Sequence, residues 1–371
     1  MEGNGNALVN RWWKLVGLSL AAVLTIALAS VWGASYYYTS QRGQGCASCH
    51  EMAVLVSAVH GSAHRTVGCM QCHEASLSTK LRHVRIHLSG RVPEQIVLRE
   101  QDVLAMGAAC QGCHQREYAS WHAGPHAATF RQIFADPSHN SRRRLMDDCL
   151  RCHGMHFPGP VRELVSPIDI QGPWSILPAG LADAPTMPCM TCHQVHRQGT
   201  PLQRPEKRIS LAGKAVSPTL GLYDRRERLH LPVTVLSIPR LNDGARPLNM
   251  SQDPRQALCY QCHAPRVPEP GSEAAAKGWG MQAGSGDDRT PMGVHEGLSC
   301  RSCHIGHNES AVASCKDCHP KMSNCGLDVE KMDATFANPK SVHNIHWVRC
   351  ADCHTKGVPK RGARGKTQSS L

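Results

Sequence analysis

The sequence predicts a fold of mainly short α-helices and irregular loops, packed around covalently attached groups and preceded by one N-terminal transmembrane helix. Its composition is the first reason. Aromatic residues make up only 5% of the 371 residues, and only four residues are Phe. Apolar residues reach 41%, but that share includes 19 Cys and 13 Met. The aliphatic and aromatic volume is too small for a large conventional core, so we expect something else to fill the interior.

The cysteines indicate what fills it. Eighteen of the 19 Cys form C-x-x-C pairs, and a His follows every pair directly. C-x-x-C-H is the attachment signature of c-type haem, in which two thiols add to the haem vinyl groups and the adjacent imidazole binds iron. The pattern predicts a multihaem cytochrome c with nine covalent haems. In chain order, the first to ninth motifs are Cys46, Cys49 and His50; Cys69, Cys72 and His73; Cys110, Cys113 and His114; Cys149, Cys152 and His153; Cys189, Cys192 and His193; Cys259, Cys262 and His263; Cys300, Cys303 and His304; Cys315, Cys318 and His319; and Cys350, Cys353 and His354.

Zinc ribbons and redox-active C-x-x-C sites are the alternatives for a single motif. His is 23 of the 371 residues, so it would follow a given pair by chance only about one time in 16. Nine occurrences in nine pairs exclude chance, and a disulfide framework would show less regular spacing. The remaining Cys325 fits a buried thiol, a disulfide partner in a dimer or an inert side chain.

The charge balance changes once haem is included. The formal net charge is +12, which by itself suggests nucleic acid or an acidic membrane as a partner. Two propionates on each of nine haems would bring the total to about −6. We therefore expect many Arg and Lys side chains to pair with propionates, since Arg suits bidentate carboxylate pairing, and we expect no nucleic-acid role.

An uncharged stretch of 20 residues, 15–34, is long enough to span a membrane once. Arg11 and Lys14 precede it, which places the N-terminus in the cytoplasm and the haem domain in the periplasm, anchored to the inner (cytoplasmic) membrane. The alternative is a cleaved signal peptide, because residues 27–29 resemble a small-residue cleavage site; we favour the retained anchor. Aromatic residues flank the stretch like an interfacial belt: Trp12, Trp13, Trp32, Tyr36, Tyr37 and Tyr38.

The spacing of the motifs predicts the domain organisation. Steps of close to 40 residues between Cys69 and Cys189 suggest a quasi-repeat with one haem per unit. Residues 79–88 and 94–106 have helical patterns, residues 231–238 favour a strand, and residues 264–299 favour a surface loop. We expect a cytoplasmic stub and anchor at 1–40, a five-haem module at 41–200, a haem-free linker at 201–258, a four-haem module at 259–354 and a basic disordered tail at 355–371.

The spare histidines predict how the irons are ligated. Fourteen His remain outside the motifs, enough to give every haem a second imidazole. Bis-His haem has no open coordination position, which favours electron transfer over substrate chemistry. Met52 is a second kind of candidate, either an axial ligand of the first haem or a packing residue. The candidate distal histidines are His60, His64, His122, His126, His139, His156, His196, His230, His295, His307, His343 and His346.

The first third of the chain resembles the NapC/NirT/NrfH family of membrane-anchored multihaem cytochromes. The resemblance runs over residues 12–130, through CASCHEM, SAVHGSAHRTVGCMQCHE, LRHVRIHLSGRVPEQIVLR and GAACQGCH. It implies that electrons enter from membrane quinol at the first haem and pass to periplasmic redox proteins. The family motif C-x-x-C-H-x-M matches Cys46, Cys49, His50 and Met52, and in some members the Met rather than the His binds the first iron.

The resemblance also implies a quinol site, for which the family uses a Lys and an acidic residue. Lys80 falls in the corresponding region. No acid follows it closely, but His83 and His87 do, and His is a plausible proton acceptor near neutral pH. We therefore take Lys80 and His87 as the candidate quinol site; a lipid headgroup or a haem propionate is the alternative partner for Lys80.

The predicted function is a membrane-anchored conduit that moves electrons from the quinone pool, or from a quinol-linked complex, to periplasmic acceptors. One alternative is an electron-transfer subunit of a larger membrane complex that has no quinol site of its own. Another is a terminal reductase, which needs one open haem. No C-x-x-C-K motif is present, which counts against the ammonia-forming nitrite reductase type.

Overall fold

The computed structural model divides the chain into two compact units, which are described separately. Unit 1 comprises Met1–Ile96 with Val195–Gly199, and unit 2 comprises Val97–Gln194 with Thr200–Leu371. The structure describes residues 3–40, 44–73, 76–92, 99–141, 144–196, 219–242, 246–263, 289–304, 307, 311, 314–315, 318–319, 328, 331–335 and 337–357. The predicted linker and tail boundaries stay predictions, since residues 201–218 and 358–371 lie outside these ranges.

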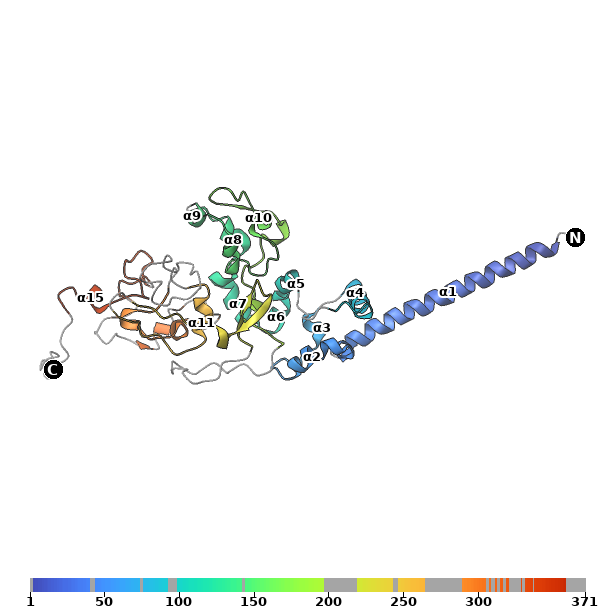
Figure 1. The fold of residues 1–371 in the computed structure, drawn as a ribbon, viewed down its shortest axis with the longest axis horizontal. Coiled ribbons are helices and arrows are strands. Elements are labelled where there is room, and N and C mark those ends of the chain that lie inside the picture. Colours follow the sequence, from blue (N-terminus) through green and yellow to red (C-terminus); the bar gives the residue numbers. More distant parts are fainter. Residues whose placement is uncertain are drawn as a thin grey trace. The chain divides into compact units, whose positions relative to one another are not determined.

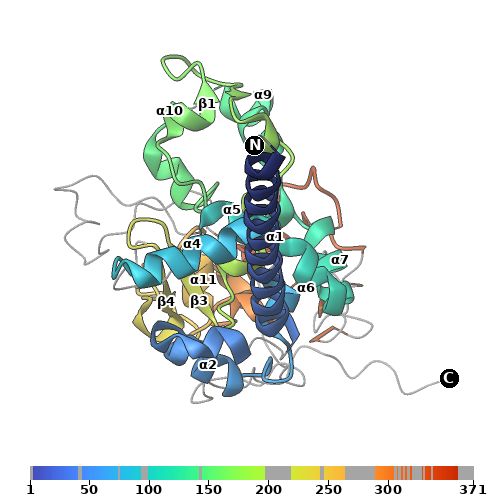
Figure 2. The same ribbon diagram turned by 90° about the vertical axis from the view of Figure 1, so that its right-hand side faces the viewer.

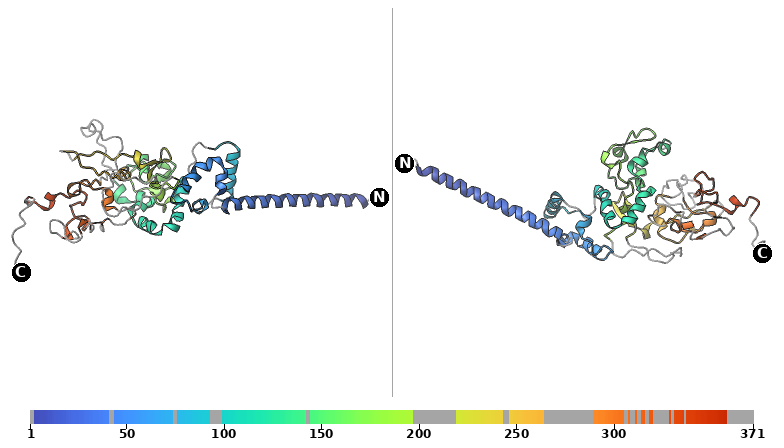
Figure 3. Two further views of the ribbon diagram at one scale, coloured as in Figure 1. Left: turned by 90° about the horizontal axis from the view of Figure 1, so that it is seen from below. Right: turned by 180° about the vertical axis from the view of Figure 1, so that it is seen from behind.

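Unit 1 begins with α1 (Gly3–Ser40), a single uninterrupted helix (Figures 1 and 3). Its segment Arg11–Tyr38 has a mean hydropathy of 2.2, and none of it is buried. Leu, Ile, Val and Ala side chains lie on all sides of this helix. Packing one face against a protein core would therefore leave the other apolar faces exposed to water. The predicted N-terminal apolar helix is confirmed as one that is long enough to cross a membrane or to serve as a signal sequence.

Short helices follow α1 in unit 1. The 12-residue α4 begins where the Ser76 side chain accepts a hydrogen bond from the N–H of Thr79, and Gly90 follows its end with a φ of 62°. It confirms the helix predicted over 79–88 and begins two residues earlier. The elements are η1 (Gln44–Ser48), η2 (His50–Met52), α2 (Ala53–His60), α3 (Cys69–Cys72) and α4 (Leu77–Leu88).

Unit 2 consists mostly of one- and two-turn helices joined by loops. The helix predicted over 94–106 is present as α5, and residues 93–98 lie outside the described ranges. The helices are α5 (Glu100–Ala105), α6 (Gly107–Cys113), α7 (Gln115–Ala123), η3 (Pro125–Ala127), α8 (Phe130–Phe134), α9 (Pro137–Asn140), η4 (Asp147–Arg151), α10 (Val161–Leu164), η5 (Ala179–Leu181), η6 (Cys189–Thr191), η7 (Val233–Val235), α11 (Gln256–Tyr260), η8 (Gly293–His295), α13 (Cys300–Cys303) and α15 (Cys350–Cys353).

Two small antiparallel pairs are the β-structure of the described part of unit 2. β1 (Val165–Ser166) pairs with β2 (Ser175–Ile176), and β3 (Gly221–Asp224) forms a hairpin with β4 (Leu229–Pro232), which Figure 2 shows. The strand predicted over 231–238 is wrong beyond Pro232. That residue lacks the N–H needed to continue the ladder, and the chain turns into the 3₁₀ helix η7 instead.

The largest apolar cluster of unit 2 surrounds the fourth motif. Leu150, which lies between Cys149 and Cys152, is completely buried, and so is Phe130. Gly154 has a φ of 128°, and a Cβ there would lie 2.7 Å from Phe130 Cε1, so only glycine fits. The other members are Phe134, Phe157, Val161, Leu164, Val165 and Trp174. The predicted short helices and loops are confirmed for the described residues.

Candidate haem-attachment sites

Eight of the nine motifs share one backbone turn. In the second to ninth motifs the N–H of the motif His donates to the carbonyl of the first Cys, with N···O distances of 2.8–3.0 Å. This bond spans four residues, as in one turn of α-helix, and brings both thiols and the imidazole to one side of the turn. The same local geometry therefore recurs in segments with different sequences and different neighbours. The donors are His73, His114, His153, His193, His263, His304, His319 and His354.

The motif His leaves the helix in a consistent way. His73, His114, His304 and His354 each end a helix with φ between −104° and −89° and ψ between 49° and 87°. These angles lie outside the helical region, so the imidazole turns away from the helix axis.

The first motif differs from the others. It is built from 3₁₀ turns, with the N–H of Cys49 donating to Cys46 O at 3.4 Å and the N–H of Met52 donating to Cys49 O at 3.0 Å. Met52 follows directly in η2, which places it within one turn of His50. Both remain candidate ligands at this motif.

The eighth motif keeps the shared turn although the structure describes little of the chain around it. The N–H of His319 donates to Cys315 O at 2.8 Å. The Cys318 side chain is exposed, whereas Cys315 and His319 are half-buried. An exposed second thiol is accessible to the vinyl group that it would attack. The predicted attachment role of Cys318 and the ligand role of His319 stay predictions.

The arrangement of the cysteines does not suit zinc. A structural zinc site brings four Cys or His ligands to one tetrahedral point. Among the described residues only one group of three potential ligands converges, Cys49, Glu51 and His87, and it contains a carboxylate rather than a second thiol. No disulfide bond joins the motif cysteines that the structure describes.

Five motif histidines are opposed by a second imidazole. In the described part of the chain, every recorded His–His ring contact joins a motif His to a His outside the motifs. Random pairing would also have joined two motif histidines or two non-motif histidines. The ring centres are 5.8 Å apart for His50 and His87, 5.7 Å for His73 and His196, 5.8 Å for His193 and His307, 6.2 Å for His263 and His126, and 6.2 Å for His304 and His346.

These separations fit an iron between the rings. An imidazole nitrogen lies about 2 Å from a bound transition metal and its ring centre about 1.1 Å further back, so two opposed ligands have ring centres about 6 Å apart. Ordinary aromatic contacts cover the same range, so the distance alone decides nothing. What favours ligation is the distance together with the exclusive pairing of motif and non-motif histidines.

The recorded ring pairs do not assign a distal ligand to the other four motifs. His153 of the fourth motif is half-buried and follows the buried Leu150 by three residues. These four motif histidines keep their ligand roles as predictions. The imidazole opposite each of them is not assigned. They are His114, His153, His319 and His354.

Hydrogen bonds orient several of the predicted distal ligands. The Nδ1–H of His346 donates to Asn344 Oδ1 at 3.0 Å, which leaves the lone pair on Nε2, and this ring lies within 8° of parallel to that of His304. His295 Nδ1 bonds to Ile345 O at 3.1 Å, and His230 Nε2 bonds to the carbonyl of Met190 in the fifth motif. Metal-binding histidines generally have the second ring nitrogen fixed in this way.

His156 is the most buried of the predicted ligands. It is 1% exposed, its ring stacks on Tyr223 at 4.2 Å, and neither ring nitrogen has a hydrogen-bond partner. Burial lowers the pKa of His156 to about 3, so the imidazole is neutral and keeps a lone pair. A buried polar ring without partners is costly, and a metal ion would satisfy it.

The remaining predicted ligands are not brought into such pairs by the recorded contacts. His60 is exposed at the end of α2, His64 is half-buried, and the ring of His122 stacks on Tyr118 at 5.8 Å. The backbone N–H of His343 donates to Ser341 Oγ. The side chain of His139 lies outside the described part of the chain. Their ligand roles stay predictions.

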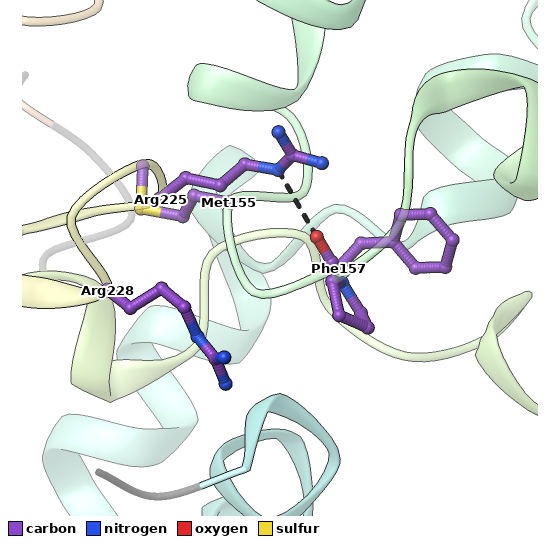
Figure 4. Close-up of a pocket in the computed structure, with 5 residues that line it drawn as sticks. Met155, Phe157, Arg225 and Arg228 are labelled. Atoms are coloured by element: carbon purple, nitrogen blue, oxygen red, sulfur yellow. Dashed lines mark hydrogen bonds between the residues drawn. The ribbon is translucent and has the colours of Figure 1, made fainter. Parts of the chain in front are cut away.

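A small cavity beside the fourth motif carries positive charge (Figure 4). It has a volume of about 90 Å³ and is lined by Met155, Phe157, Pro158, Arg225 and Arg228. Arg225 Nε donates to Phe157 O at 3.2 Å, and its Nη2 donates to the carbonyl of Gly159, so this guanidinium is fixed in place. Two guanidinium groups at a cavity of this size suit a carboxylate such as a haem propionate.

The predicted quinol residues lie near the end of α1 in unit 1. Lys80 Nζ on α4 donates to Ser35 Oγ on α1 at 3.2 Å. His87 Nδ1 lies 2.8 Å from Glu51 Oε1, and the same oxygen is 3.3 Å from His50 Nε2. Glu51 is therefore the acidic residue that sequence reasoning missed; its position directly after the motif His was the available signal. The ring of His87 also lies 5.8 Å from that of His50, centre to centre.

The comparisons with known proteins add no family to these observations. No family model, curated protein or solved structure matches this chain.

Proposed function

We propose that this chain is a membrane-anchored cytochrome that carries nine covalent haems and transfers electrons. The observation that supports it most strongly is the repeated C-x-x-C-H turn, closed by the same hydrogen bond in eight motifs, together with the five imidazole pairs. Haem supplies an iron that cycles between ferric and ferrous states when it is bound.

The residues of the chain determine what that chemistry can do. The motif cysteines would hold each haem covalently, and at the five paired motifs the two imidazoles would bind the iron and keep a substrate from it. Arg225 and Arg228 at the cavity of Figure 4 could bind a propionate carboxylate. Two imidazoles at each of the five paired motifs would let those haems transfer electrons without binding substrate at iron, which supports a conduit at these positions.

The membrane side of the proposal concerns unit 1. α1 would act as the retained anchor, with Arg11 and Lys14 on the cytoplasmic side, so that the haem domain lies in the periplasm. Lys80 can donate a hydrogen bond to a quinol oxygen near the membrane surface, and the Glu51 carboxylate, which His87 Nδ1 approaches to 2.8 Å, can accept a proton there. The electron source is then the quinone pool, and the acceptors are periplasmic redox proteins.

Quinol oxidation is tested with the intact protein in detergent. The oxidised protein is mixed anaerobically with a reduced menaquinol analogue, and the haem α-band is followed over time. Lys80→Ala should slow the quinol-driven phase about tenfold or more, because a hydrogen bond from a charged group contributes about 1.5–3 kcal/mol. Arg85→Ala, an exposed cation on the same helix, is the matched control and should leave the rate unchanged.

The experiment separates the two conduit roles. Dithionite should reduce every variant normally, which shows that the haems are intact. If quinol fails to reduce the wild-type protein while dithionite succeeds, the quinol site is refuted. The chain would then be an electron-transfer subunit that is supplied by another membrane complex.

A further inference from the structure

One face of α4 in unit 1 carries four exposed apolar side chains, called the apolar line below. They recur at intervals of four, three and four residues, which places them within about 60° of one another around the helix. Single exposed apolar residues are common on protein surfaces, but four on one helix face are not scattered. No residue of α4 is buried. The side chains of the apolar line, between 41% and 79% exposed, are Leu77, Leu81, Val84 and Leu88.

The rest of α4 is mostly polar and basic. It includes Lys80, Arg82 and His83, and the helix contains no Asp or Glu. A helix with an apolar line on one side and basic groups on the others has the pattern of helices that lie at the boundary between lipid headgroups and acyl chains. A partner protein could also cover such a line, but the position of α4 favours lipid.

α4 contacts α1 where that helix leaves the predicted membrane span. Lys80 Nζ on α4 donates to Ser35 Oγ on α1 at 3.2 Å, and Figure 1 shows α4 beside this part of α1. Ser35 directly follows the uncharged stretch 15–34, and the exposed, stacked rings of Trp32 and Tyr36 flank it with centres 5.9 Å apart. Exposed Trp and Tyr side chains mark the headgroup level of a membrane helix. The hydrogen bond therefore holds α4 at that level.

The orientation of α4 agrees with this position. In Figure 2 α1 is seen foreshortened along its axis and α4 runs across the view, so the two helix axes cross. A helix that crosses a membrane-spanning helix at headgroup level lies along the membrane surface. Lys80, which faces α1, lies about 70° around α4 from the middle of the apolar line. The apolar line can therefore face the acyl chains while Lys80 keeps its contact with α1.

We propose that α4 is an interfacial helix that inserts its apolar line into the membrane surface beside α1. The inference rests on the retained anchor proposed above and goes beyond it by assigning a second lipid contact. α4 also carries Lys80 and His87, so this contact sets the candidate quinol residues at the depth of the lipid headgroups. A quinol headgroup in the same layer then reaches them without leaving the membrane.

The contact is tested by thiol labelling in lipid nanodiscs that each hold one copy of the full-length protein. Cys325→Ser provides a parent without the single cysteine outside the motifs, and cysteines in thioether bonds to haem do not react. Leu81→Cys and Arg82→Cys are introduced separately into this parent; both positions are exposed, so neither change should disturb folding. A charged, water-soluble maleimide is added, and labelling at each site is followed by peptide mass spectrometry.

Leu81→Cys should label about tenfold or more slowly than Arg82→Cys, because lipid excludes the charged reagent from the apolar line. After unfolding in urea the two should label equally fast, and a lipid-soluble maleimide should label Leu81→Cys at least as fast as Arg82→Cys in nanodiscs. Equal rates with the charged reagent would refute the contact. Slow labelling of Leu81→Cys by both reagents would also refute it, because protein would then cover the line. Leu88→Cys against Ser89→Cys is a second pair, for use if the first does not assemble.

The same samples separate this inference from the proposals on which it rests. Labelling of motif cysteines in the parent contradicts haem attachment, while the comparison of the introduced cysteines remains valid because each site is read separately. A mature protein that lacks α1 or does not enter nanodiscs contradicts the retained anchor and the contact together. An assembled, unlabelled parent with equal labelling at both introduced sites contradicts only the contact.

Discussion

The carboxylate of Asp253 should be one of the most important polar groups for the stability of unit 2. Asp253 and Arg255 form a bidentate pair with Oδ···N distances of 2.9 Å, and their side chains are only 3% and 9% exposed. Asp253 also accepts hydrogen bonds from the backbone N–H of Arg255 at 3.1 Å and from Ser299 Oγ at 2.8 Å. The pair therefore holds the loop before the sixth motif against the start of the seventh.

Asp253→Ala leaves a buried guanidinium without its partner. Breaking a buried ion pair by removing one side costs about 3–5 kcal/mol, because the remaining charge stays desolvated. Asp102→Ala is the matched control, since Arg99 and Asp102 form the same bidentate geometry at 2.7 and 2.8 Å with side chains 47% and 38% exposed. That exposed pair contributes below about 1 kcal/mol.

Urea unfolding followed by the haem Soret band and by far-UV circular dichroism measures both variants against the wild-type protein. The midpoint should fall strongly for Asp253→Ala and hardly at all for Asp102→Ala, with an unchanged dependence on urea concentration. Losses that agree to within about 1 kcal/mol would refute the reasoning, because burial would then not decide the cost.

Two further predictions concern the core and the ligands. Gly154→Ala should lower the free energy of unfolding by about 1–3 kcal/mol, because of its φ of 128° and its contact with Phe130, whereas Gly180→Ala, with nothing within 4 Å of its Cβ, should change it by less than about 0.5 kcal/mol. His307→Ala should leave the iron bound to His193 five-coordinate, which gives one high-spin ferric signal in electron paramagnetic resonance. A purely low-spin spectrum of His307→Ala would exclude this pairing.

The sequence was most informative where one short pattern determines local geometry. The C-x-x-C-H pentapeptide predicts its own turn, and the structure repeats that turn in eight motifs because only five residues are involved. The apolar stretch before residue 40 likewise predicts α1, since length and hydropathy suffice for such a helix. The helix over 79–88 was predictable from its pattern, and its Ser76 cap explains the earlier start.

Features that depend on distant segments could not be predicted in this way. Nothing in the spacing of His126 indicates that it opposes His263, because that contact forms only when two separate loops pack together. Glu51 was missed for a similar reason, since its partner His87 lies on α4, well separated along the chain. The strand predicted over 231–238 failed at Pro232, where a local backbone constraint outweighed the preference of the β-branched residues.

The number of covalently bound haems tests the central claim most directly. The protein is purified in detergent, its haem content is determined from the pyridine haemochrome spectrum per polypeptide, and the intact mass is measured after acid–acetone extraction, which removes haem that is not covalently bound. The account predicts nine haems that resist extraction, one for each C-x-x-C-H motif. A polypeptide that carries zinc or disulfides in place of haem after expression with a working cytochrome c maturation system would contradict it.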